Sequence, residues 1–298
     1  MKVIEKQVYE FVKKSKRIYK IINLAMICLT VIIFMQDYSD VSEFFDGMTM
    51  ISSFILIGST ILVHAVKAGR LYLALYGTGI ELNAHLKIYC KVIPVSVVFP
   101  YKIGEFFRMY CYGTQLGNPL TGIVIILFDR FVDTAALVTA ILLVWLLSGG
   151  KVTSLVYILL IFLAFVLFVY GAFPKVCIFW KKYLLKAKAT ENSLAVLAML
   201  ERANTLYHVV ENVVVGRGII LYFMSLIAWG VEIGSVALLS KMLNSKVIDI
   251  VITNYLTSAM SGNQSIELRQ FIFTSVVLLT AFYLIIKILE KAGKKVYK

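Results

Sequence analysis

The sequence predicts an all-α polytopic membrane protein with about six transmembrane helices and two re-entrant hairpins. Three observations predict this class: 60% of the 298 residues are hydrophobic, the mean hydropathy is +0.86, and long apolar runs recur along the chain. A helix rises about 1.5 Å per residue, so a bilayer core of about 30 Å needs about 20 apolar residues. Soluble domains do not have this composition.

The candidate spans follow one another with short connections. They cover residues 18–35, 48–66, 120–147, 152–173, 219–239 and 268–289. The first is short, and Lys20 at its edge must reach the interface for it to cross. No linker of biased composition separates the spans. We therefore interpret residues 1–298 as a single integral membrane domain.

Two further apolar segments predict re-entrant hairpins. Residues 88–101 are interrupted by Pro94 and Pro100, and residues 247–260 run into a polar stretch. Proline removes a helical hydrogen bond, and interrupted apolar segments in corresponding halves of a transporter indicate its binding site. Residues 191–215 are moderately amphipathic and predict a cytoplasmic interfacial helix.

The basic residues indicate orientation. The net charge is +13, but the cations gather at helix ends and tails, which argues against a nucleic-acid partner. The N-terminal region is basic, whereas residues 36–47 contain four acidic residues and no Lys or Arg. By the positive-inside rule, both termini are cytoplasmic in the cell membrane. The same rule places the later basic clusters on the inner side, and the first of these contains Lys67, Arg70, Lys87 and Lys91.

Charged residues interrupt two of the apolar regions, at residues 98–108 and 128–133. A charged side chain at mid-bilayer costs about 3 kcal/mol, so these groups should face one another or a wet cavity. If both stretches are helical, the spacings i,i+3 and i,i+4 bring neighbouring charges onto one side. They bring Glu105 to Arg108, and Asp129 and Arg130 to Asp133. Internal ion pairs that only lock the bundle are the alternative to a substrate pathway.

Glu232 lies near the middle of the fifth span, between Gly230 and Gly234. Small residues at that spacing favour close helix packing. If transport is coupled to a gradient, Glu232 is the first residue to test. Glu267 lies beside the second hairpin.

The charged motifs resemble a known family. Pro-x-x-x-Gly-Glu-x-x-Arg at residues 100–108, followed by Asp-Arg-Phe-Val-Asp at residues 129–133, resembles the flippase-like transmembrane domain of lysylphosphatidylglycerol synthetases. The resemblance spans most of the chain and includes Arg70 after the second span. The family's second Pro/Gly-rich hairpin is represented here by Gly262 and Glu267 without the other Pro and Gly residues, which indicates a divergent member. The resemblance does not include the soluble aminoacyl-transfer domain of the full-length synthetases, so we expect a stand-alone translocase.

The resemblance implies a lipid translocase that passes a headgroup through a charged intramembrane cavity. Arg108 and Arg130, with Lys102, would hold the lipid phosphate, because guanidinium groups match phosphate oxygens. The carboxylates would orient these cations or meet a cationic headgroup. The candidate substrate-binding residues are Arg70, Lys102, Glu105, Arg108, Asp129, Arg130, Asp133, Glu232 and Glu267.

Two other function classes stay open. An intramembrane enzyme acting on a lipid-linked substrate would use the paired carboxylates, but the common metal and nucleophile motifs are missing. A small-solute transporter, or a scaffold for a lipid-modifying enzyme, would also suit broken helices. We expect a non-enzymatic protein with no cofactor. Its expected partners are a membrane phospholipid, glycolipid or isoprenoid phosphate, a lipid-modifying enzyme, and a second copy of the chain.

Overall fold

The computed structural model describes residues 2–40, 45–99, 103–148, 154–186, 191–242, 248–261 and 264–296. Regular structure in these ranges is helical, without strands, which confirms the all-α prediction. The helices are α1 (Lys2–Asp37), α3 (Met50–Leu75), α4 (Leu82–Val98), α5 (Ile103–Gln115), α6 (Pro119–Ser148), α7 (Ser154–Lys186), α8 (Glu191–Met242), α9 (Ile248–Ser261) and α10 (Ile266–Val296).

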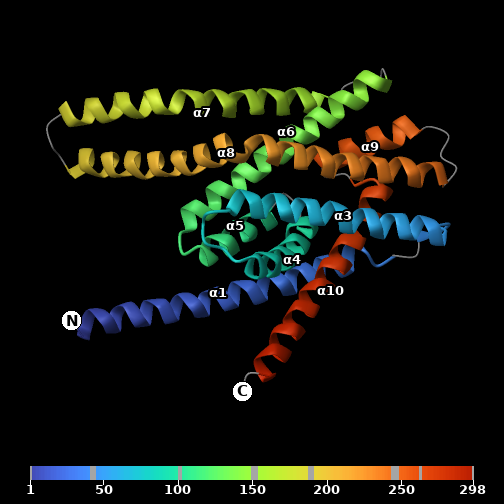
Figure 1. Ribbon diagram of the computed structural model, residues 1–298, viewed down its shortest axis with the longest axis horizontal. Helices are drawn as coiled ribbons and strands as arrows, with labels where there is room; N and C mark the ends of the chain where they lie inside the picture. Colours follow the sequence, from blue (N-terminus) through green and yellow to red (C-terminus); the bar gives the residue numbers. More distant parts are fainter. Residues whose placement is uncertain are drawn as a thin grey trace.

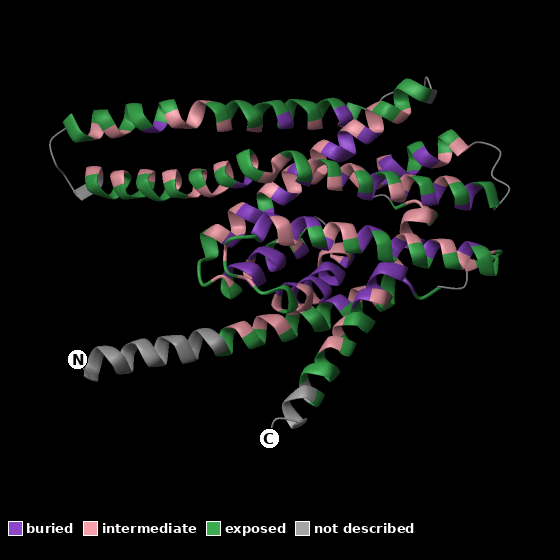
Figure 2. Cartoon of the chain, in the orientation of Figure 1, coloured by how far each residue is buried: buried purple, intermediate pink, exposed green. Residues whose placement is uncertain are grey.

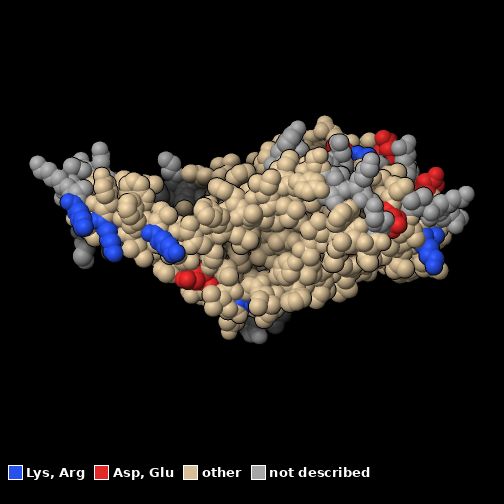
Figure 3. Space-filling view, turned by 90° about the horizontal axis from the view of Figure 1, so that it is seen from above, with Lys and Arg blue, Asp and Glu red and all other residues tan. Residues whose placement is uncertain are grey.

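Six of the described helices are long and apolar enough to cross a membrane: α1, α3, α6, α7, α8 and α10. Each overlaps one predicted span. Their outward surfaces carry many exposed large apolar side chains, most densely on α7. Figure 3 shows one face of the corresponding belt, on which charged side chains are few and Lys and Arg lie toward both ends. Exposing so wide an apolar surface to water is unfavourable, whereas contact with lipid chains is not. The chain is therefore an integral membrane protein.

Helices α3 and α8 run antiparallel through the centre of the bundle. At one end, Ser52 Oγ donates to Met242 Sδ at 3.6 Å. At the other, Arg217 Nη1 donates to the Leu73 carbonyl at 2.7 Å, which caps the end of α3. Buried residues concentrate where α3, α4, α5, α6 and the second half of α8 meet (Figure 2). This region encloses the charged residues.

Helix α8 differs from the sequence prediction. The predicted interfacial helix at residues 191–215 and the fifth span form one continuous helix of 52 residues, about 78 Å long. Its first half pairs with α7 as a hairpin that extends past the bundle (Figure 1). Lys181 Nζ lies 2.7 Å from Glu201 Oε1, and the Tyr170 and Tyr207 rings stack at 5.1 Å. The interfacial-helix prediction is wrong because these residues continue the helix of the fifth span without a break, so they do not form a separate helix on the membrane surface.

The predicted hairpins correspond to short helices. Residues 88–98 lie in α4, which continues through Pro94 without interruption. This helix ends at Val98, and α5 begins at Ile103. Pro100 lies outside the described residues. From residue 248 on, the second segment forms α9 (Ile248–Ser261), a single short helix that precedes α10.

Glycines let α5 pack at backbone distance between α4 and α6. A methyl group on Gly104 would lie 2.3 Å from the Ser96 Cα, and one on Gly122 would lie 2.5 Å from the Gly113 Cα. Neither contact leaves room for a side chain. These glycines therefore determine how deeply α5, with its charged residues, enters the bundle.

Helices α1 and α10 run in opposite directions along α4. Tyr38 at the end of α1 packs on Phe273 near the start of α10, with ring centroids 5.6 Å apart. Lys87 near the start of α4 pairs with Glu290 near the end of α10 at 2.5 Å, and Lys91 donates to Asn23 of α1 at 2.6 Å. The end of α10 and the first half of α1 thus lie on the same side of the bundle.

Candidate functional site

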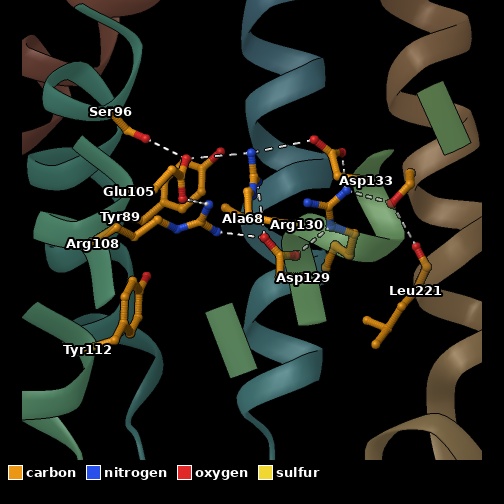
Figure 4. A network of polar contacts seen from close by, with 12 residues as sticks. Ala68, Tyr89, Ser96, Glu105, Arg108, Tyr112, Asp129, Arg130, Asp133 and Leu221 are labelled. Atoms are coloured by element: carbon orange, nitrogen blue, oxygen red, sulfur yellow. Dashed lines mark hydrogen bonds and ion pairs between the residues drawn. The ribbon is translucent and has the colours of Figure 1, made fainter. Parts of the chain in front are cut away.

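Six charged side chains from three helices form one connected group, which we call the charge network. Figure 4 shows how α5, α6 and α3 bring its members together next to α8. Its members are Arg70 of α3, Glu105 and Arg108 of α5, and Asp129, Arg130 and Asp133 of α6.

Asp129 is the common acceptor of the three arginines. Its Oδ1 accepts from Arg70 Nε at 2.8 Å. Its Oδ2 accepts from Arg108 Nη2 at 2.8 Å and from Arg130 Nη2 at 3.1 Å. One carboxylate thereby ties α3 and α5 to α6.

The other two carboxylates extend the network toward its neighbours. Arg70 Nη1 donates to Asp133 Oδ1 at 2.5 Å and to Ser225 Oγ of α8 at 2.5 Å. Glu105 Oε1 accepts from Ser96 Oγ of α4 at 2.5 Å. The network therefore connects five helices: α3, α4, α5, α6 and α8.

The predicted short-range pairs are confirmed. Arg108 Nη1 lies 3.3 Å from Glu105 Oε2, and Arg130 Nη1 lies 3.5 Å from Asp133 Oδ2. Arg70 was predicted to follow the second span, but it lies buried within α3, and its pairings with α6 were not predicted. Ser96 and Ser225 carried no signal in the sequence, because a lone serine in an apolar helix usually bonds to its own backbone.

The network is electrically balanced, since three guanidinium groups face three carboxylates. Its members differ in exposure. The side chains of Arg70, Arg108 and Asp129 are each 1% exposed, whereas that of Arg130 is 32% exposed. Breaking a buried pair by removing one partner costs about 3–5 kcal/mol, so the inner three groups are fixed together. Arg130 is the most exposed member of the network and forms its accessible edge.

Three guanidinium nitrogens of the network are buried without a hydrogen-bond partner among the described residues: Arg70 Nη2, Arg108 Nε and Arg130 Nε. Buried donors are nearly always satisfied by protein, water or ligand. The network thus retains donor capacity for oxygen atoms that the described residues do not supply.

Glu232 belongs to a second group, which we call the Lys67 cluster and which also contains Tyr255. Lys67 Nζ of α3 lies 2.9 Å from Glu232 Oε2 of α8. Tyr255 of α9 donates its hydroxyl to Glu232 Oε1. Lys67, predicted only as an inner-side cation, lies within α3 one turn before Arg70. That i,i+3 spacing was the signal that could have placed it in the interior.

Close packing at the glycines beside Glu232 was also predicted, and it is wrong. A methyl group on Gly230 or Gly234 would meet nothing within 4 Å. The close helix contacts occur at Gly104, Gly113 and Gly122 instead.

The remaining predicted residues lie apart from the network. Glu267 begins α10 and is partly buried; its carboxylate acts electrostatically on Tyr255, and no hydrogen bond or ion pair joins it to the charge network. Lys102 lies outside the described residues. Within the described ranges, no three His, Cys, Asp or Glu side chains are placed to hold a metal ion.

Comparison with known proteins gives one match. The family described as lysylphosphatidylglycerol synthase TM region matches residues 16–266, most of the 298-residue chain. Neither the curated proteins nor the solved structures contain a match. The matched range contains the whole charge network and the Lys67 cluster. The chain therefore belongs to the family of lysylphosphatidylglycerol synthase transmembrane regions.

Proposed function

We propose that the protein is a lipid translocase that moves a phosphate-bearing headgroup between the leaflets of the cell membrane, with both termini cytoplasmic. The candidate substrates are an anionic phospholipid, a glycolipid or an isoprenoid phosphate. Family membership supports a lipid-related role. The observation that carries the proposal is the position of Arg130 at the accessible edge of a buried, balanced charge network.

Arg130 is suited to exchange its partners. Its Nη1 lies 3.7 Å from Glu105 and 3.5 Å from Asp133, whereas Arg70 and Arg108 hold Asp129 at 2.8 Å. Longer pairs at a more exposed position are weaker. A phosphate can replace these carboxylates because the guanidinium fork matches its oxygens.

The other two arginines would then position Arg130. Arg108 was a candidate phosphate ligand in the sequence, but its 1% exposed side chain already donates to Glu105 and Asp129. While Arg70 and Arg108 hold Asp129, that carboxylate stays in place beside Arg130 when a headgroup arrives. We therefore assign phosphate contact to Arg130 and positioning to Arg70 and Arg108.

The pair α4 and α5 would be the re-entrant element. The two helices have 17 and 13 residues, about 26 and 20 Å, and each is shorter than a membrane span. The hydrogen bond from Ser96 to Glu105 joins them beside their connection. A hairpin that enters and leaves on the cytoplasmic side would carry Arg108 to the network while the two chain ends stay on one side.

Leaflet exchange in liposomes tests the proposal. Purified protein is reconstituted in phosphatidylcholine vesicles with a trace of phosphatidylglycerol that bears a fluorescent acyl chain, and dithionite bleaches the outer leaflet. We expect exchange above that of protein-free vesicles, and at least about tenfold slower exchange for Arg130→Ala, since a charged hydrogen bond contributes about 1.5–3 kcal/mol.

The matched control is Lys87→Ala, which removes a cation from a half-exposed pair on the surface. It should exchange lipid as the wild type does. Exchange by Arg130→Ala at the wild-type rate, with equal amounts of reconstituted protein, would refute the assignment.

A further inference from the structure

The Lys67 ammonium has hydrogen-bond donors that its partner Glu232 does not occupy. The ammonium has three donors, and Glu232 Oε2 is the one hydrogen-bond acceptor recorded for them among the described residues. The other oxygen of Glu232 accepts from Tyr255. The Lys67 side chain is 18% exposed, whereas that of Glu232 is 4% exposed. The cation is thus the accessible half of the pair.

An indole lies beside the same ammonium. Lys67 Nζ is 5.0 Å from the ring centroid of Trp229, an arrangement that stabilises a cation in a dry environment. Trp229 is 6% exposed, and its Nε1 is buried without a hydrogen-bond partner in the described part of the chain. Free ammonium donors next to an unpaired indole N–H would suit an anion with several oxygens.

The Lys67 cluster continues the path from the charge network. Lys67 precedes Arg70 by one helical turn, and its charge acts on Asp133, which Arg130 contacts. On α8, Glu232 follows Ser225, the partner of Arg70, by seven residues, about 10 Å along the axis. A phosphate released by Arg130 would therefore meet Lys67 next, further from the cytoplasmic side.

We infer that Lys67 is a second phosphate-binding residue, which receives the headgroup after Arg130 and is held by Glu232 and Trp229 while the site is empty. The inference rests on the proposed function. The incoming phosphate displaces the Glu232 carboxylate from the ammonium. Glu232 keeps its hydrogen bond from Tyr255 on α9, so that short helix holds the displaced group.

Trp229 offers a local reporter. The chain has three tryptophans, and the other two, Trp145 and Trp180, are 39% and 45% exposed on the outer surface. Replacing both by Phe leaves Trp229, next to Lys67, as the single tryptophan. The detergent-purified protein is titrated with dihexanoyl-phosphatidylglycerol, and in a separate arm with sodium phosphate, while its emission is recorded.

We expect a saturable change with the lipid and none with sodium phosphate at equal concentration. Lys67→Ala should shift the midpoint at least about tenfold to higher concentration, and Lys67→Arg should restore binding to within about threefold. Glu232→Gln should lower the midpoint several-fold, because the ammonium loses its competing carboxylate. Lys87→Ala is the matched lysine control and should change nothing.

Two results overturn the inference. One is a titration midpoint for Lys67→Ala equal to that of the parent. The other is lipid binding by Glu232→Gln that is weakened as much as by Lys67→Ala, because a purely structural ion pair predicts equal losses. A response to sodium phosphate alone would overturn the lipid assignment in favour of a free anion. The outcome for the proposed function is separate. Unchanged exchange by Arg130→Ala refutes that function even if the Trp229 titration succeeds.

Discussion

The charge network and the Lys67 cluster draw their cations from neighbouring turns of α3, yet their surroundings differ. Arg70 is 1% exposed and shared between Asp129, Asp133 and Ser225. Lys67 is 18% exposed and has one carboxylate. A cation buried among its acceptors locks helices together, whereas a more exposed cation can exchange partners. Intramembrane charge alone therefore does not identify a substrate contact; the exposure of the cation separates Arg130 and Lys67 from Arg70 and Arg108.

We expect the largest effect from a substitution that removes Asp129, the common acceptor of the charge network. Asp129→Ala leaves Arg70 and Arg108 buried without their shared carboxylate, so we expect a loss of about 3–5 kcal/mol in the free energy of unfolding. Thermal unfolding of the detergent-solubilised protein measures it. Glu290→Ala, in an exposed pair, is the control and should stay within about 1 kcal/mol. Equal stability of the two variants would show that the network is not the lock we describe.

A smaller effect is expected where the backbone positions the network. Gly104→Ala places a methyl group 2.3 Å from the Ser96 Cα, and such overpacking costs about 1–3 kcal/mol. It should separate α5 from α4 and slow lipid exchange. Gly230→Ala is a matched glycine in open space and should be neutral or stabilising by up to about 1 kcal/mol. If Gly230→Ala proves the more damaging, the assignment of the close contacts is wrong.

The smallest effect concerns the Lys67 cluster. Tyr255→Phe removes the hydroxyl that donates to Glu232, and we expect a loss of about 1–2 kcal/mol in unfolding free energy. Because Glu232 is then held by Lys67 alone, the ammonium should release it less readily, and the Trp229 titration should shift to higher lipid concentration. A cost as large as that of Asp129→Ala would remove the contrast between the two regions.

Much of the fold was predictable because it depends on local or compositional quantities. Six apolar runs predicted six membrane-crossing helices, since the energy of transfer into hydrocarbon scales with apolar length. The exception was α8, whose polar stretch at residues 191–215 was predicted to lie on the membrane surface. The error arose because hydropathy reports the solvent a residue prefers and cannot report that the helix of the fifth span continues unbroken through this stretch.

The contacts of the candidate site also fall into two groups, those that the sequence predicts and those that it does not. The pairs of Glu105 with Arg108 and of Arg130 with Asp133 follow from helical period alone. The pairing of Lys67 with Glu232 joins residues 165 positions apart, and no local rule predicts it. Arg108 was predicted to contact phosphate because its chemistry suits it, and only its burial indicates a positioning role.

By itself, the sequence determined that the chain is a membrane-spanning helical protein with intramembrane charges, and which of these charges are helical neighbours. Those properties depend on transfer energies and on the helical repeat. Tertiary structure decided which arginine stays accessible and which lysine keeps unused donors. Close glycine contacts at Gly104, Gly113 and Gly122 bring the consecutive helices α4, α5 and α6 to backbone distance. The packed bundle leaves Arg70 and Arg108 enclosed, whereas Arg130 and Lys67 are more exposed and within reach of a ligand.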